Sequence, residues 1–226
     1  MPHIRAVVFD MDGVVIDSHP AHREAWRDFL HDLHRDVDER DLDYILDGRK
    51  REDILQHFLG YLTPEQLRTY GKQKDALFLR QSEQVRPMPG LLGFLLQLRR
   101  QRIPLALATS ASATRTHSTL ARLNLLSYFT AVLTANDVEE SKPDPAIYRL
   151  ACNRLFVSPH EAIAVEDGVS GIQAAKTAGL FCVAVDSEHD SGRLLAAGAD
   201  IVIRHFNGLT PQMLERWLET QNRKYA

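Results

Sequence analysis

The hydrophobic pattern divides the chain into short strands that alternate with helices, interrupted once by a helical stretch. The first apolar run, Ala6 to Phe9, contains β-branched residues and is typical of a buried strand. Similar runs, separated by helical patterns, predict strands at residues 103–108, 131–133, 162–165, 181–185 and 201–203. Repeated strand–helix–strand units predict an α/β fold with a doubly wound parallel sheet.

From Ser18 to about Gln84 the pattern is helical, and we find no convincing strand in it. Helices are predicted at residues 20–33, 42–46 and 51–59, and a longer one opens at Thr63. That opening combines an N-cap threonine, a proline at the first helical position and a glutamine at the third. Proline and glycine at residues 86–90 end the stretch. We therefore expect a helical domain at 18–87, inserted into a domain made of 1–17 and 88–226.

Composition favours small-molecule chemistry. The 226 residues are 44% hydrophobic and 25% charged, and 27 basic against 30 acidic side chains give a formal charge of −3. Nothing in this balance favours nucleic acid or an anionic membrane. Cys152 and Cys182 have no metal-ligand spacing, so we expect reduced core residues. Without a long apolar run or a signal peptide, we expect a cytoplasmic protein. From the size of the chain we expect a monomer.

Two carboxylates follow the first strand. In an extended backbone, Asp10 and Asp12 face the same side, roughly 6.5 to 7 Å apart along the chain. Gly13 then allows a sharp turn. Close carboxylates repel each other, and an oxygen-preferring cation such as Mg²⁺ would relieve the repulsion. The alternative is an ordinary solvated Asp-Gly turn.

Two other predicted strands also end in polar residues, Thr109-Ser110 and Glu166-Asp167. Ligands of doubly wound sheets bind outside the carboxyl ends of the strands, so we expect these tips to converge on one crevice. As alternatives, Thr109 and Ser110 could cap the next helix, and Glu166 and Asp167 could form a surface acidic pair. The position of the acidic pair directly after an apolar run favours the crevice.

Four separated motifs together resemble the haloacid dehalogenase superfamily, in the branch with a helical cap that includes β-phosphoglucomutase and sugar-phosphate phosphatases. They are Asp10-Met11-Asp12-Gly13-Val14, Ala108-Thr109-Ser110, Lys142-Pro143-Asp144-Pro145, and Glu166-Asp167-Gly168 followed by Gly171-Ile172-Gln173-Ala174-Ala175. The resemblance covers nearly the whole chain. It implies a Rossmann-like core with an inserted α-helical cap.

The resemblance also implies roles for the acidic residues. Asp10 would attack phosphorus and become an aspartyl phosphate, and Asp12 would act as general acid and base. Mg²⁺ would be held by the carboxylates of Asp10 and Asp167 and by the backbone carbonyl of Asp12. Glu166 would act through a bound water or by supporting the other ligands.

Phosphate binding is assigned on the same basis to Lys142, to the Thr109 hydroxyl and to the Ser110 backbone N–H. A carboxylate cannot approach a phosphate dianion unless charge is neutralised, and Mg²⁺ and Lys142 would supply that charge. The alternative for Lys142 is a solvated loop lysine.

In the helical cap, the resemblance points to His22, Arg51 and Lys74 as substrate residues, with His22 assisting Asp12 and Arg51 holding a distal phosphate. A histidine on an amphipathic helix is often simply half-buried. Two residues depart from the pattern: Ile54 stands where the mutases would have a serine, and Gly168 replaces the serine that commonly follows the acidic pair.

The expected function is a Mg²⁺-dependent phosphatase that acts on a small phosphorylated metabolite, in particular a sugar phosphate. The alternative is a β-phosphoglucomutase, which would pass the phosphoryl group to a second sugar hydroxyl. A non-catalytic binding module would have lost some of the charged motif residues, and all are present. A dehalogenase would not need the Asp12 acid or the metal-binding pair.

Overall fold

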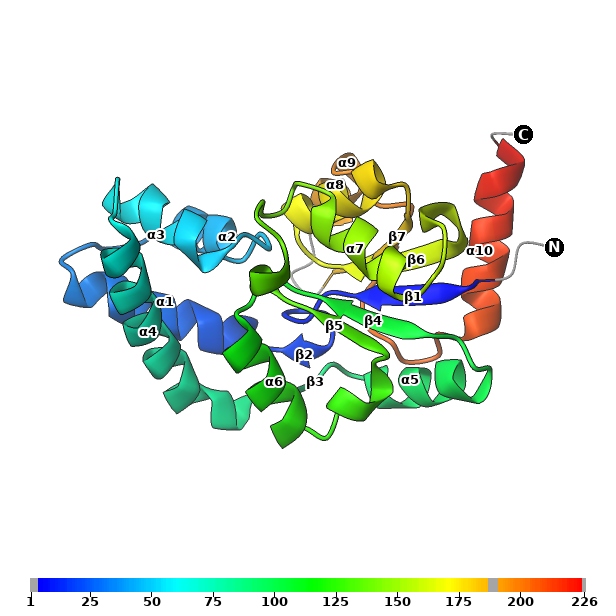
Figure 1. The fold of residues 1–226 in the computed structure, drawn as a ribbon, viewed down its shortest axis with the longest axis horizontal. Coiled ribbons are helices and arrows are strands. Elements are labelled where there is room, and N and C mark those ends of the chain that lie inside the picture. Colours follow the sequence, from blue (N-terminus) through cyan, green and yellow to red (C-terminus); the bar gives the residue numbers. More distant parts are fainter. Residues whose placement is uncertain (1–3, 187–190, 225–226) are drawn as a thin grey trace.

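The computed structural model describes residues 4–186 and 191–224 and contains a six-stranded parallel sheet with helices on both faces (Figure 1). Its order is β5-β4-β1-β6-β7-β8, so the α/β prediction is confirmed. The strands are β1 (Ala6–Phe9), β4 (Leu105–Ala108), β5 (Ala131–Leu133), β6 (Ala162–Glu166), β7 (Phe181–Val185) and β8 (Ile201–Ile203). β4 begins two residues later than predicted, after Pro104, which has no backbone N–H to donate to a neighbouring strand.

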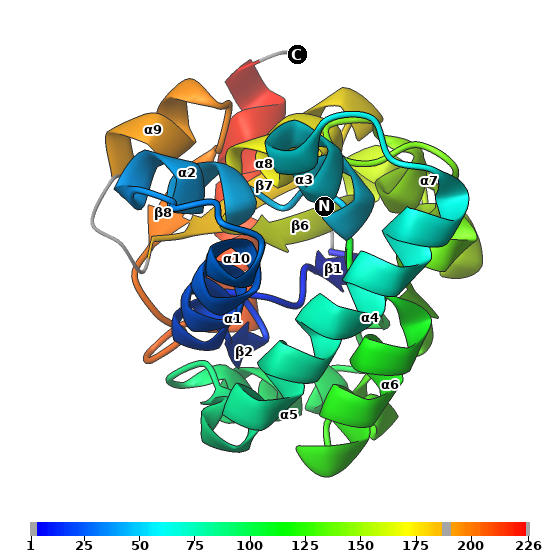
Figure 2. The ribbon, with the colours of Figure 1, turned by 90° about the vertical axis from the view of Figure 1, so that its left-hand side faces the viewer.

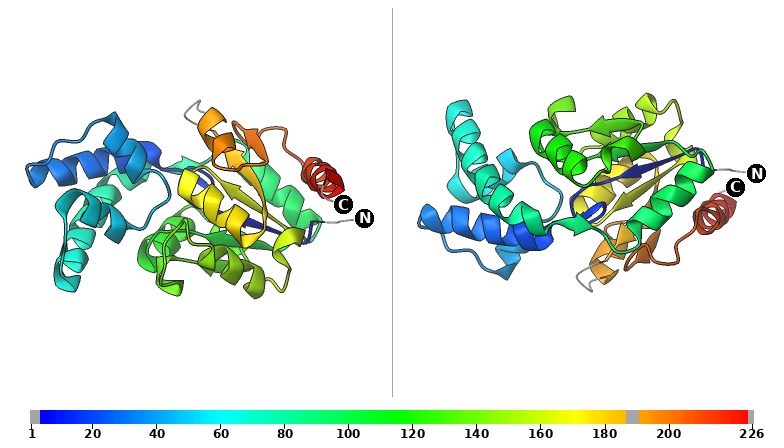
Figure 3. Two further views of the ribbon diagram at one scale, coloured as in Figure 1. Left: turned by 90° about the horizontal axis from the view of Figure 1, so that it is seen from above. Right: turned by 90° about the horizontal axis from the view of Figure 1, so that it is seen from below.

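Large and small side chains alternate along the buried strands. In β1, Val7 and Phe9 pack on the face covered by α5, α6 and α10, whereas Ala6 and Val8 pack on the face covered by α7, α8 and α9. Alanines repeat on this second face in β4 and β6, which lets the helices approach closely. Figure 3 shows the two helical layers. The helices are α5 (Leu91–Arg100), α6 (Ala113–Arg122), α7 (Ala146–Arg154), α8 (Val169–Ala178), α9 (Ser191–Ala196) and α10 (Pro211–Lys224).

The helical stretch lies beyond the carboxyl ends of β1 and β4, with α1 and α4 nearest the viewer in Figure 2. It has its own buried cluster, which includes Trp26, Phe29 and Leu55. Thr63 and Gln66 form the predicted capping box at the start of the longest helix. The division at residues 18 and 87 stays a prediction. The helices are α1 (His19–Asp32), α2 (Glu39–Ile45), α3 (Arg51–Leu59) and α4 (Pro64–Gln81).

Two short strands were missed from the sequence. β2 (Ile16–Asp17) and β3 (Arg86–Pro87) pair in antiparallel fashion where the chain enters and leaves the helical stretch. Two residues are too few to show an alternating pattern. This pairing holds the two connections side by side.

Both cysteines are buried and free, as expected. In the described part of the chain, no helix combines the length and apolar character needed to cross a membrane.

Candidate active site

The carboxyl ends of the strands place acidic side chains around one buried lysine. Asp10 follows β1 and Glu166 ends β6, and Lys142 Nζ lies 2.6 Å from Asp10 Oδ1 and 2.6 Å from Glu166 Oε1. The Tyr148 hydroxyl also donates to Glu166. Lys142 is only 2% exposed, so it is not the solvated loop lysine of the alternative interpretation. Burial lowers its pKa, but Asp10 and Glu166 more than offset this effect and hold the pKa above its usual range.

The acidic side chains outnumber this lysine. One oxygen from each of Asp10, Glu166 and Asp167 can be chosen so that all three lie within 4.8 Å of one another. Burial raises the pKa of Asp10, and Glu166 and Asp167 raise it further. Burial likewise raises the pKa of Asp167 to about 6, although His19 Nε2, 2.9 Å from its Oδ2, opposes that shift. Crowded carboxylate oxygens are the donor set that a hard divalent cation prefers, so these residues fit such an ion.

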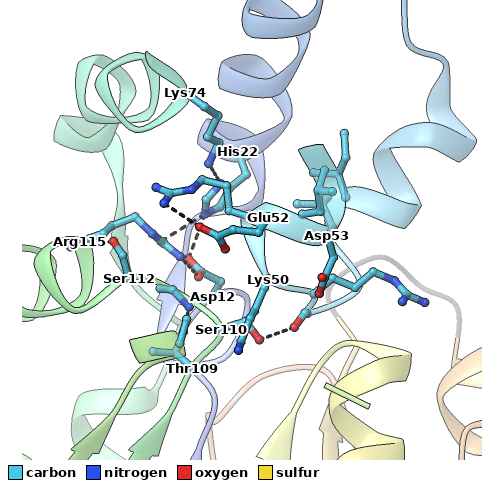
Figure 4. Close-up of a pocket in the computed structure, with 18 of the residues that line it drawn as sticks. Asp12, His22, Lys50, Glu52, Asp53, Lys74, Thr109, Ser110, Ser112 and Arg115 are labelled. Atoms are coloured by element: carbon cyan, nitrogen blue, oxygen red, sulfur yellow. Dashed lines mark hydrogen bonds and ion pairs between the residues drawn. The ribbon is translucent and has the colours of Figure 1, made fainter. Parts of the chain in front are cut away.

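Asp12 faces the helical stretch and has partners on both of its oxygens (Figure 4). Its Oδ1 accepts from the Ser18 hydroxyl at 2.6 Å and lies 3.2 Å from His22 Nε2. Arg115 donates to both oxygens, at 2.9 and 2.6 Å. Burial would raise the pKa of Asp12, but Arg115 and His22 hold it well below its usual value. Asp12 is therefore ionised at rest, and its carboxylate lines the cavity.

A second buried lysine orients His22. Lys74, from α4, lies with Nζ 2.9 Å from His22 Nδ1 and is 3% exposed. Since the ionised Asp12 carboxylate only accepts, the imidazole proton is on Nε2, facing Asp12, and Nδ1 accepts from Lys74. Burial and nearby Lys74 lower the pKa of His22 to about 3. Burial and Arg115 lower the pKa of Lys74 to about 7. The structure thus brings two of the three expected cap residues to Asp12.

A cavity of about 450 Å³ lies between the strand ends and the helical stretch, and it is lined by Asp10, Asp12, Thr109 and Ser110 among others. The Ser110 hydroxyl donates to the Gly48 carbonyl across the cavity at 2.6 Å. Neither Thr109 nor Ser110 caps the next helix: the N-cap of α6 is Ser112, whose Oγ accepts from a backbone N–H. The capping alternative is therefore wrong.

Arg51 also lines the cavity, but carboxylates already hold its guanidinium. Its Nη1 donates to Asp75 and to the Gly71 carbonyl at 3.3 Å, and its Nη2 donates to Glu52 at 2.9 Å. We expected Arg51 to be available for a distal phosphate. In the structure it lies between α3 and α4, in a network within the helical stretch, and the phosphate-binding role stays a prediction.

Sequence comparisons agree with the geometry. A family model described as haloacid dehalogenase-like hydrolase matches residues 4–179. A phosphorylated carbohydrates phosphatase from Thermotoga maritima is 34% identical over 215 residues, which cover 89% of this chain and 94% of the relative. The chain belongs to the haloacid dehalogenase-like hydrolases. The resemblance seen in the four motifs is thus confirmed.

One further relative and one solved structure are named as β-phosphoglucomutases. The β-phosphoglucomutase of Bacillus subtilis is 31% identical over 224 residues, covering 95% of this chain and 96% of that one. A crystal structure of β-phosphoglucomutase from Clostridium difficile superposes with a TM-score of 0.85 at 23% identity, covering 96% and 98% of the two chains, and supports the fold. The chain is an enzyme of the phosphohydrolase and phosphotransferase class.

Asp47 is a contact that we did not foresee in this hydrolase. From the loop after α2, it accepts a hydrogen bond from Val169 N–H at 2.8 Å and from the Ser170 hydroxyl at 2.6 Å, at the start of α8. A Cβ on Gly168 would lie 2.9 Å from the Asp47 backbone. The departure at Gly168 therefore makes room for this loop, beside the acidic cluster.

Arg115 and His19 were also missed. Neither lies in a recognisable motif: Arg115 is on the first turn of α6, and His19 begins α1. Each touches an acidic motif residue only because distant segments meet at the sheet edge. No local signal in the sequence could have found them.

Proposed function

We propose that this enzyme is a Mg²⁺-dependent phosphatase that hydrolyses a carbohydrate monophosphate through an aspartyl phosphate on Asp10. The observation that carries the proposal is Asp10 itself, placed at a strand end beside Lys142 and two further carboxylates and open to the cavity. Supporting it, one relative is a phosphorylated carbohydrates phosphatase and another, in Escherichia coli, is a fructose-1-phosphate phosphatase.

The proposed metal ligands are the carboxylates of Asp10 and Asp167 and the backbone carbonyl of Asp12, with Glu166 in support. Bound Mg²⁺ would supply positive charge against the phosphoryl oxygens. Calorimetric titration of Mg²⁺ into the wild-type protein should show binding, and Asp167→Asn should weaken it. Equal affinity in the two proteins would remove Asp167 from the ligand set.

In the proposed reaction, a carboxylate oxygen of Asp10 attacks phosphorus and the bond to the sugar oxygen breaks. Asp12, ionised at rest, first takes a proton from solvent as the substrate displaces Arg115 from it, and it then gives this proton to the leaving oxygen. Water then attacks the aspartyl phosphate, Asp12 takes its proton, and the Asp10–phosphorus bond breaks to release phosphate. Lys142 orients Asp10, while the Thr109 hydroxyl and the Ser110 N–H bind phosphoryl oxygens.

We propose that residues 18–87 act as a cap whose His22 and Lys74 complete the site above Asp12. A neutral His22 can orient the Asp12 carboxylate without adding charge, and Lys74 brings a positive charge close to the substrate. The cavity of about 450 Å³ is of a size that suits a small sugar phosphate.

A β-phosphoglucomutase is the second candidate, favoured by the 31% identity to the Bacillus subtilis enzyme. The two candidates share every step up to the aspartyl phosphate. They differ in whether water or a second sugar hydroxyl then attacks phosphorus.

Phosphorus NMR separates the two candidates. The protein is mixed with Mg²⁺, β-glucose 1-phosphate and a trace of glucose 1,6-bisphosphate. Inorganic phosphate is expected, here or with another carbohydrate monophosphate in a panel. Glucose 6-phosphate without inorganic phosphate would establish the mutase and overturn the proposal. Asp10→Asn serves as the control for both products.

A further inference from the structure

The guanidinium of Arg51 packs into the space that Gly71 leaves on the surface of α4. Gly71 and Asp75 are four residues apart, so they lie on the same face of α4, and the guanidinium of Arg51 lies against both. A Cβ on Gly71 would come within 2.6 Å of Arg51 Cζ and Nε. A larger residue at this position would force the guanidinium to move. Arg51 therefore joins α3 to α4, with its charge already paired.

The ion pairs of Arg51 leave one negative charge in excess at this point of the cavity wall. Arg51 carries one positive charge, whereas its partners Glu52 and Asp75 carry two negative charges, and all three side chains line the cavity. Glu52 and Asp75 keep 39% and 26% of their side chains exposed, so an incoming ligand meets them. A second phosphate placed here would face like charges at short range, which is destabilising.

The neighbouring cations keep their charges, but their contacts are with groups other than Glu52 and Asp75. Lys50 Nζ donates to the carbonyls of Val138 and Glu139, at 2.9 and 2.6 Å. The Arg49 guanidinium lies over the Tyr44 ring, 4.7 Å from its centroid. Lys74 and Arg115 contact His22 and Asp12 instead, where the transferred phosphoryl group is proposed to react.

We propose that the carboxylate pair, Glu52 and Asp75, determines specificity by admitting substrates whose non-phosphorylated end is neutral and hydroxyl-bearing and by rejecting a second phosphate. Carboxylates accept hydrogen bonds from sugar hydroxyls, so the same pair favours a polyol tail. The proposal rests on the phosphatase function and names its substrate class, a carbohydrate monophosphate. It assigns a specificity role to residues outside the four motifs.

The test compares matched sugar phosphates as competitive inhibitors of p-nitrophenyl phosphate hydrolysis. The pairs are glucose 6-phosphate with glucose 1,6-bisphosphate, and fructose 1-phosphate with fructose 1,6-bisphosphate. The wild-type enzyme should bind the monophosphate of at least one pair about tenfold more tightly than its bisphosphate. Asp75→Asn and Glu52→Gln should each lower this ratio of monophosphate affinity to bisphosphate affinity. The double variant should lower the ratio most, by about tenfold.

Asp28→Asn is the matched control, because Asp28 is an exposed carboxylate on α1 outside the cavity, and its ratio should stay at the wild-type value. Glu52→Gln keeps the Arg51–Asp75 pair, so the test survives if Asp75→Asn does not fold. Bisphosphates that bind the wild-type enzyme as tightly as monophosphates would overturn the specificity proposal, and so would an unchanged ratio in Glu52→Gln. Failure of the phosphatase function is distinguishable, since the wild-type enzyme would then hydrolyse neither p-nitrophenyl phosphate nor any carbohydrate monophosphate.

Discussion

Two buried lysines show how differently the two sides of the cavity are built. Lys142, beneath the strand ends, contacts two carboxylates at 2.6 Å, and its pKa is held above the usual range. Lys74, on the opposite wall, contacts an imidazole nitrogen, and burial lowers its pKa to about 7. Two carboxylates compensate the first charge directly, while the hydrogen-bond partner of the second is a neutral imidazole.

The two lysines differ in whether their charges stabilise the folded protein or reduce its stability at a position that lines the cavity. On the sheet side, the Lys142 charge is part of a network that is already complete without a phosphate. On the helical side, Lys74 is kept at a cost in stability. Positions that oppose folding and line a cavity are candidates for function.

The largest effect is expected for Asp10→Asn, which removes the nucleophile and leaves both lysines in place. Phosphate release should fall by roughly 10⁴-fold, because an amide oxygen is a poor nucleophile towards phosphorus. Asp12→Ala should come close to this loss. Circular dichroism should show that both variants fold, and a wild-type rate in Asp10→Asn would refute the central role of this residue.

Lys142→Met removes the buried cation at the strand ends. It leaves Asp10 and Glu166 buried together without their shared cation, so the free energy of unfolding should fall by about 3–5 kcal/mol. Urea unfolding measured without Mg²⁺ tests this effect. Unchanged stability would mean that the network around Lys142 contributes nothing to the fold.

Lys74→Met tests the opposite wall of the cavity, and it should change the free energy of unfolding in the opposite direction from Lys142→Met. With a pKa lowered from 10.5 to about 7, the folded protein binds fewer protons at Lys74 than the unfolded chain between these pH values. The Lys74 contribution therefore makes the wild type more stable as pH rises through this window. Lys74→Met should remove that slope and raise the free energy of unfolding at pH 7 by about 2 kcal/mol, while hydrolysis of sugar phosphates falls. Urea unfolding at several pH values measures the slope, and loss of stability at pH 7 would contradict the comparison.

The smallest effect is expected for Asp47→Ala, which leaves both lysines intact and loosens the contact between the two walls. Losing the acceptor at the start of α8 should cost about 1 kcal/mol of stability. The KM for a sugar phosphate should rise about fivefold, whereas the KM for p-nitrophenyl phosphate should change little. The aryl ester makes fewer contacts with the cavity walls, so its binding depends less on how closely the walls approach each other. A KM that stays at the wild-type value for both substrates would exclude this role.

The strand tips illustrate what local sequence can predict. Asp10, Thr109 and Glu166 each follow or end an apolar run, and parallel strands share one carboxyl edge, so their convergence follows from chain order and strand direction. The helical stretch was equally accessible through its periodicity and through the capping box at Thr63. These features depend on neighbours along the chain or on the regular geometry of a parallel sheet.

Arg51 illustrates the limit. The family resemblance predicted a ligand for a distal phosphate at this position, and no neighbouring residue in the sequence predicted that its charge is paired with Asp75, 24 residues away on another helix. Arg115 and Asp47 likewise acquire their roles from partners more than 100 residues distant.

By itself, therefore, the sequence determined the alternation of strands and helices, the family and the polar ends of the strands, because each is encoded in local periodicity or in a contiguous motif. The tertiary structure alone decided which charges are paired with carboxylates and which lie against neutral groups, as the contrast between Lys142 and Lys74 shows. Electrostatic interactions depend on distance and burial in space, and neither quantity can be read from positions along a chain.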